Sequence, residues 1–241
     1  LEGATRIGDR VYWITSHGRN AEGKDRPNRQ RFFATDITRE GDAQALVPAG
    51  APCKDLLQAL LLDPRLGPFH LDDASRRAPK KEGALNIEGL AATPDGRLLI
   101  GFRNPIPGGK ALLVPLKNPG ATARGARPEF DDPLLLDLGG LGIRSIERAG
   151  DRYVIIAGPS GEGGPIRLYS WGGGASPPTG LDAAEFSGST PEALLVTEGP
   201  DGLACEFLSD DGTIPIDGRP CKRLADPARK CFRAIRLNIP Q

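Results

Sequence analysis

The feature that most constrains the fold is a pattern that occurs four times along the chain. Each copy contains an apolar stretch, a tight acidic turn and a second apolar or alternating stretch. The turns read "IGDR" at 7–10, "PDGR" at 94–97, "AGDR" at 149–152 and "GPDG" at 199–202. Gly and Asp supply the backbone conformations that tight hairpin turns need. The pattern therefore predicts four antiparallel hairpins.

Further strands follow each hairpin. Third strands are expected at "RFFATDI", "ALLVPL", "IRLYSW" and "FRAIRL", and fourth strands near "AQALVP", "LLLDL" and "AAEF". Four antiparallel strands in about 50 residues is the size of a β-propeller blade. We therefore predict an all-β fold, in which residues 1–241 form one propeller domain. Its four-stranded blades are expected at about 1–49, 85–138, 142–186 and 190–241.

A helical insert is predicted between the first two blades, at about 50–84. Its stretch "CKDLLQALLLDPRL" places four leucines, Leu56, Leu57, Leu60 and Leu61, on one helical face. A surface helix that covers a blade is favoured over a functional lid.

The two ends of the repeat differ from a closed ring. The first copy begins at its innermost strand, and the fourth stops after its third strand. Propellers usually cover such an open edge with a strand from the other terminus. We therefore expect an upstream segment or a second chain to complete the ring to six blades.

Composition narrows the classes of partner. Lys plus Arg and Asp plus Glu number 31 each, which argues against general binding to nucleic acid or to membrane surfaces. No apolar run approaches the ~20 residues that span a bilayer, so no membrane span is predicted. The four cysteines have no zinc-type spacing, and their even number indicates two disulfides in a secreted or periplasmic protein. Four buried thiols are the alternative.

The repeat predicts that polar residues meet at one mouth of the central channel. The start of a first strand and the end of its hairpin partner lie at the same end of a blade. Glu2, Glu88 and Arg144 each precede their turn aspartate by seven residues, and Glu192 precedes its own by nine. Buried carboxylates need a cation, an arginine or a polar ligand. A Glu–Arg network is one interpretation. The other is a site for calcium or another divalent cation, held by Glu2, Asn86 and Glu88.

The loops that follow the second strands offer candidate contacts for a small anionic substrate. Arginine binds carboxylate and phosphate groups in bidentate fashion. The candidates for substrate binding are Arg19, Asn20, Arg103, Asn104 and Arg144. His17 ends a strand in a polar loop and is a candidate proton-transfer group. Five cationic residues lie between positions 19 and 31, for which a solvated basic loop is the plain alternative.

Several stretches resemble a known family. The stretches "LEGATRIGDRVYWITSHGRNAEGKDRPNRQRFFAT", "NIEGLAATPDGRLLIGFRNP" and "GLGIRSIER" with "YVIIAGPSG" resemble a bacterial domain-of-unknown-function family, often exported and propeller-like. More distantly, the Glu-Gly strand starts are similar to those of phytase-like esterases and of gluconolactonase and paraoxonase propellers. In those enzymes a glutamate at this position ligates a central calcium, which implies that role for Glu2 or Glu88. Arg144 departs from the pattern at the third equivalent position.

Two functions follow from these expectations. The first is a hydrolase of ester bonds, in phosphate esters or other anionic esters, at the channel mouth. Its arginines would hold the anion, Glu2 or Glu88 would ligate a cation or orient water, and His17 would transfer a proton. The second is a non-catalytic periplasmic propeller that binds a ligand or a protein on the same face. Because no Walker loop or dinucleotide fingerprint is present, no organic cofactor is expected.

Overall fold

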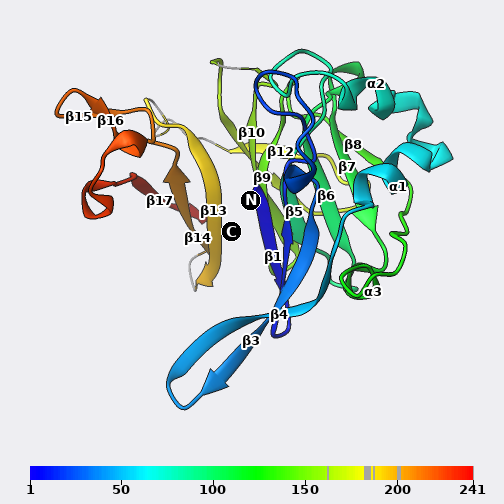
Figure 1. Cartoon of the computed structure of the whole chain (residues 1–241), viewed down its shortest axis with the longest axis horizontal. Helices are drawn as coiled ribbons and strands as arrows, with labels where there is room; N and C mark the ends of the chain where they lie inside the picture. Colours follow the sequence, from blue (N-terminus) through cyan, green and yellow to red (C-terminus); the bar gives the residue numbers. More distant parts are fainter. Residues whose placement is uncertain (162, 182–185, 187, 200–201, 241) are drawn as a thin grey trace.

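The chain folds into four antiparallel sheets arranged as the blades of a β-propeller (Figure 1). The structure is a computed structural model that describes residues 1–161, 163–181, 186, 188–199 and 202–240. The first strand of every blade is innermost: β5 packs against β1 and β9, and β9 packs against β13. This arrangement confirms the all-β propeller that the repeated turns predict.

The strands follow the predicted order within each blade. Blade one contains β1 (Gly3–Ile7), β2 (Arg10–Ile14), β3 (Phe32–Glu40) and β4 (Ala43–Cys53). Blade two contains β5 (Asn86–Ala92), β6 (Leu98–Asn104), β7 (Ala111–Leu116) and β8 (Leu134–Leu136). Blade three contains β9 (Gly142–Ala149), β10 (Arg152–Gly158), β11 (Arg167–Trp171) and β12 (Thr179–Leu181). Blade four contains β13 (Pro191–Gly199), β14 (Gly202–Ser209) and β17 (Ala234–Pro240).

The observed boundaries refine the expected ones. Strand β4 runs to Cys53, past the expected end of blade one at residue 49, and the β3–β4 hairpin extends away from the body of the molecule (Figure 1). The fourth strand expected at 183–186 lies largely outside the described residues, and β12 pairs with β11 just before it. A separate two-stranded ribbon, β15 (Pro215–Ile216) with β16 (Arg219–Pro220), precedes β17. Completion of the ring to six blades stays a prediction.

Short helices occupy the insert, as the leucine spacing predicts. They are α1 (Leu56–Leu62) and α2 (Leu71–Ser75), and a third short helix, α3 (Pro119–Thr122), follows β7. Leu56 and Leu60 are fully buried in the core shared by blades one and two, and Leu57 and Leu61 pack against that core. The insert therefore covers the sheet surface. Among the described residues, no helix has the length and apolar character that a bilayer crossing requires.

Apolar side chains form a separate core between each pair of neighbouring blades. Ile14 and Phe102 meet between blades one and two, and Trp171 and Ile143 belong to the core between blades two and three. Phe207 belongs to the core between blades three and four. Burial of each such side chain contributes about 1.5–3 kcal/mol, so packing between blades holds the sheets in their radial order.

The four cysteines are free thiols in this structure, where two disulfides were expected. Cys53 lies in the core between blades one and two, whereas Cys205 lies in the core between blades three and four. Because these two cores lie between different pairs of blades, the two thiols cannot pair with each other. Burial raises the pKa of the Cys205 thiol to about 11, so it stays protonated. The buried-thiol alternative therefore describes both.

Blade three packs closely against blade two at a pair of glycines. Gly89 and Gly101 face each other across β5 and β6, and Ile143 of β9 fills the space beside them. A Cβ atom on Gly101 would lie 2.9 Å from Cγ2 of Ile143 and 3.1 Å from the Cα of Gly89. Neither neighbour has room to move, because both belong to packed strands.

We expect Gly101→Ala to lower the free energy of unfolding by about 1–3 kcal/mol, because it overpacks this seam between blades. Urea denaturation measures the change. Gly67→Ala is the matched control, since an added Cβ there meets no atom within 4 Å. Equal stabilities of the two variants would contradict the prediction.

Candidate functional site at the channel mouth

The starts of the four inner strands surround one cavity of about 340 Å³. Glu2 precedes β1, Glu88 lies in β5, Arg144 lies in β9 and Glu192 lies in β13, and all four line the cavity. Leu1, Gly3, Ala4 and Ala193 complete its wall. The seven-residue register therefore identifies three of the four side chains, Glu2, Glu88 and Arg144, that the fold brings together here.

Glu88 and Arg103 form a buried ion pair beside this cavity. Nη1 of Arg103 donates to Oε1 of Glu88 at 2.9 Å, and their side chains are 8% and 10% exposed. Nδ2 of Asn86 donates to the same carboxylate oxygen at 2.8 Å. Arg103 also donates to the carbonyls of Pro159 and Gly161, at 2.9 and 2.8 Å. The pair therefore anchors a loop of blade three to the inner strand of blade two.

Arg144 is the cation at the centre of the cavity. Its side chain is 4% exposed, and its Nη2 donates to Oε1 of Glu192 in a short ion pair. Its Nε is buried and has no hydrogen-bond partner among the described residues. Burial, followed by repulsion from Arg103, lowers the pKa of Arg144. Arginine stays charged even so, and Nε remains a buried donor for which the described residues supply no acceptor.

Glu2 is the carboxylate without an ion pair among the described residues. Glu2 is exposed as a whole residue, but partial burial of its carboxyl group and the nearby charge of Glu88 raise its pKa to about 7. The charge of Glu192 acts in the same direction, while the chain's amino terminus and Arg29 oppose it. Glu2 therefore exchanges its proton near neutral pH.

His17 does not reach this cavity. Its side chain is 1% exposed, its backbone has the left-handed φ of 53°, and its main-chain N–H donates to Arg29 O at 2.8 Å. Nδ1 donates to the carbonyl of Thr15 at 2.7 Å, so Nε2 is unprotonated. Burial, together with the charge of Arg31, lowers the pKa of His17 to about 4. The ring is thus neutral and enclosed, a position that does not favour proton transfer to a substrate.

Three other expected substrate contacts organise loops instead. Arg19 donates from Nε to Ser75 O at 3.0 Å and from Nη1 to Gly23 O at 3.1 Å. Oδ1 of Asn20 accepts from the main-chain N–H groups of residues 22 and 24. Asn104 donates to Lys81 O at 2.8 Å. None of the three lines the cavity, so each one's role in substrate binding stays a prediction without support from its position.

The donor set does not favour a divalent cation. Among the residues that the structure describes, no group of three or more His, Cys, Asp or Glu side chains is placed to hold a metal ion. Arg103 and Asn86 both direct N–H donors at Glu88, and Arg144 lies across the cavity. The arrangement matches the Glu–Arg network. Calcium at Glu2, Asn86 and Glu88 stays a prediction.

Glu192 is the cavity-lining residue that the register ranked too low. It lies nine residues before its turn aspartate, and the register of β13 shifts between Pro191 and Ala193, on either side of it. The sequence signal that identifies Glu192 is its residue type rather than its spacing, because Glu192 begins an inner strand just as Glu2 and Glu88 do.

The fold and this site define a class: a β-propeller whose inner strands gather carboxylates and guanidinium groups at one channel mouth. A family described as "Protein of unknown function (DUF3616)" matches residues 28–182 of the chain. The match covers more than half of the sequence, so the chain belongs to this family. A search of the curated proteins found no match.

We expect Glu2→Gln to change how stability depends on pH. The folded-state pKa of Glu2 is raised to about 7 from a usual value of 4.5, so folding favours its protonated form. Wild-type protein loses that contribution as pH rises from about 4.5 through 7, whereas the variant does not. Thermal melts at pH 5 and pH 8 should therefore favour the variant only at pH 8. The same gain in Glu40→Gln, a change at the exposed end of the β3–β4 hairpin, would exclude this cause.

Removing one partner of the buried ion pair should lower the free energy of unfolding more than removing both partners. Arg103→Leu leaves Glu88 charged and buried without its cation, which costs about 3–5 kcal/mol. Adding Glu88→Leu removes the uncompensated charge and should restore part of the loss. Urea unfolding of the two single variants and the double variant measures this coupling. Additive losses would show that the pair does not act as a unit.

Proposed function

We propose that the chain is a non-catalytic binding propeller whose channel mouth holds a small ligand that carries a carboxylate or phosphate group. Arg144 carries the proposal, because its side chain is 4% exposed, lines the cavity and has one donor, Nε, without an acceptor among the described residues. A buried unsatisfied donor costs about 1–3 kcal/mol. A ligand oxyanion would satisfy it.

Glu192 occupies part of the position that the ligand would take. Within the described part of the chain, its side-chain hydrogen bond is to Nη2 of Arg144, and its side chain is 45% exposed. Nε and Nη2 lie on the same side of a guanidinium, the side that binds an oxyanion through two parallel hydrogen bonds. A ligand carboxylate would use both donors while Glu192 turns toward solvent. Glu192 is therefore an internal competitor for the ligand.

Glu2 makes this binding depend on pH. Protonated Glu2 donates a hydrogen bond to an oxyanion, whereas ionised Glu2 repels it. Since the pKa of Glu2 is about 7, affinity should rise as pH falls through neutrality. The cavity of about 340 Å³ lies within the size range of pockets that hold small ligands.

Ester hydrolysis is the second candidate, because a carboxyl group with a pKa near 7 suits general acid–base catalysis. It has less support than binding. His17 is enclosed outside the cavity, and Arg103 is engaged by Glu88 and by two carbonyls. Secretion or a periplasmic location stays a prediction under either function.

Calorimetric titration with phenyl phosphate and phenylacetate tests the binding proposal. We expect Arg144→Gln to abolish binding and Glu192→Gln to tighten it by up to about tenfold, which corresponds to 1.4 kcal/mol. Glu198→Gln, on the same strand but outside the cavity, should bind like wild type. Absence of binding in wild type, or full binding in Arg144→Gln, would overturn the proposal.

Turnover assays separate the second candidate from the first. The chromogenic esters p-nitrophenyl phosphate and p-nitrophenyl acetate are tested with wild type and with Glu2→Gln. Turnover that disappears in Glu2→Gln would establish hydrolysis. Binding without turnover in wild type supports the non-catalytic module.

A further inference from the structure

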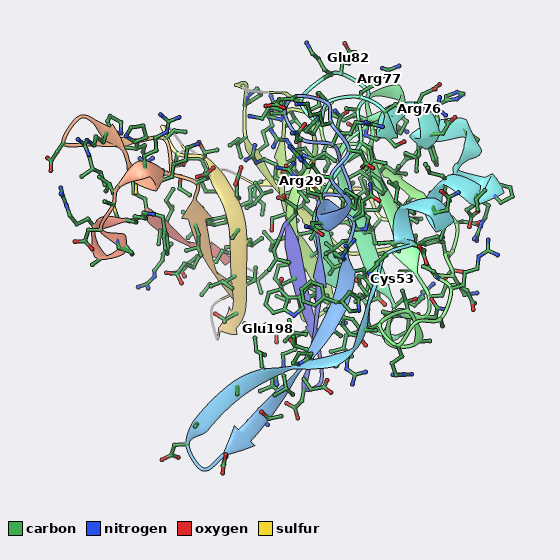
Figure 2. All side chains as sticks on the ribbon, viewed as in Figure 1. Arg29, Cys53, Arg76, Arg77, Glu82 and Glu198 are labelled. Atoms are coloured by element: carbon green, nitrogen blue, oxygen red, sulfur yellow. The ribbon has the colours of Figure 1, made fainter. Side chains whose placement is uncertain are left out.

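Two loops form one continuous surface at the channel-mouth end of the molecule. The first, residues 15–31, follows β2, and the second, residues 76–85, follows α2. Nε of Arg19 reaches across to Ser75 O at 3.0 Å, and Gly18 packs against Leu85 O so closely that a Cβ would lie 2.5 Å from it. Figure 2 shows Arg29, Arg76 and Arg77 at this end, opposite the β3–β4 hairpin.

The two loops carry a strong excess of positive charge. They hold nine basic and three acidic residues, although the whole chain holds 31 of each. The basic residues, which we call the basic surface, are Arg19, Lys24, Arg26, Arg29, Arg31, Arg76, Arg77, Lys80 and Lys81. Most of them are exposed. In the remainder of the chain, acidic residues therefore outnumber basic ones.

Main-chain carbonyls, rather than carboxylates, hold several of these arginines. Arg19 donates to the carbonyls of residues 75 and 23, and Arg29 donates to Arg19 O at 3.2 Å. Arg31 donates to Gln30 O at 2.7 Å and to Pro27 O. A hydrogen bond to a neutral carbonyl fixes the position of a guanidinium group but does not neutralise its charge. These three side chains are therefore positioned in advance and remain positive.

Four further members of the basic surface, Lys24, Arg26, Arg76 and Lys81, are only weakly compensated. Lys24 pairs with Glu22 at 3.0 Å and Arg76 pairs with Asp73 at 3.9 Å, both between well-exposed side chains. Exposed pairs of this kind contribute little and are screened by salt. The side chains of Arg26 and Lys81 form no hydrogen bond or ion pair within the described part of the chain. An excess of accessible cations remains.

We propose that the basic surface docks an acidic, Asp- and Glu-rich segment of a partner protein. Six of its nine cations are arginines, whose planar fork binds carboxylates through two hydrogen bonds. The two loops contain no Phe, Tyr or Trp, so they lack the rings on which single-stranded bases stack and the anchors of membrane-surface segments. The balanced charge of the whole chain also disfavours general polyanion binding. This surface does not depend on the ligand proposed for the cavity.

The test uses the full chain and a fluorescently labelled peptide of alternating glutamate and alanine. Fluorescence anisotropy measures its affinity at low ionic strength and at about 0.15 M salt, where charge attraction is screened beyond about 8 Å. The triple variant Arg26→Gln, Arg76→Gln, Lys81→Gln should bind at least about tenfold more weakly and with a smaller salt dependence. It should retain phenyl phosphate binding at the cavity, which separates the two proposals.

A matched control removes three exposed cations elsewhere: Arg39→Gln, Arg152→Gln and Arg236→Gln. It changes the net charge equally and should bind the peptide like wild type. Equal weakening in both triple variants would overturn the proposal, as would no peptide binding by wild type at low salt. Tighter binding of duplex DNA, or of phosphatidylserine vesicles, than of the peptide would also overturn it. Thermal melts confirm that each variant is folded.

Discussion

Close packing between the inner strands of neighbouring blades is the constraint on which the rest of the structure depends. Gly89 and Gly101 have no side chains, so Ile143 of the next blade reaches the backbone of β5 and β6. This contact fixes β9 beside β5, and it thereby fixes Arg144 beside Glu88. A seam of apolar contacts thus determines which charged groups meet at the channel mouth, although none of those groups contributes to the seam.

Charge balance explains the protonation behaviour of the site. Three carboxylates and two guanidinium groups lie close together, and each guanidinium pairs with one carboxylate: Arg103 with Glu88, and Arg144 with Glu192. Glu2 is left over, and burial of its carboxyl group, followed by the proximity of Glu88 and Glu192, favours its neutral form. The raised pKa of Glu2 is therefore a property of the whole group of residues. The pKa of Glu2 would fall if a metal cation or another positively charged group entered the cavity.

The sequence predicts the radial order of strands well because the turns and the strand lengths are local signals. The shared position of Glu2, Glu88 and Arg144 follows from the same register. The surroundings of each side chain do not follow from it. His17 is enclosed where its left-handed backbone turns the ring toward Thr15 O, and the register of β13 shifts beside Glu192. The spacing of residues along the chain encodes neither of these local conformations.

The uneven placement of charge also affects events before any contact forms. The 27 residues of the two mouth loops hold nine of the 31 cations but only three of the 31 acidic groups, so the two loops form the positive end of a chain whose formal net charge is zero. A dipole turns in the field of an approaching anion. An acidic partner would therefore meet the molecule already rotated with its channel mouth forward, and a larger fraction of collisions would be productive. Orientation in solution is thus a consequence of loop composition, independent of how tightly the final complex is held.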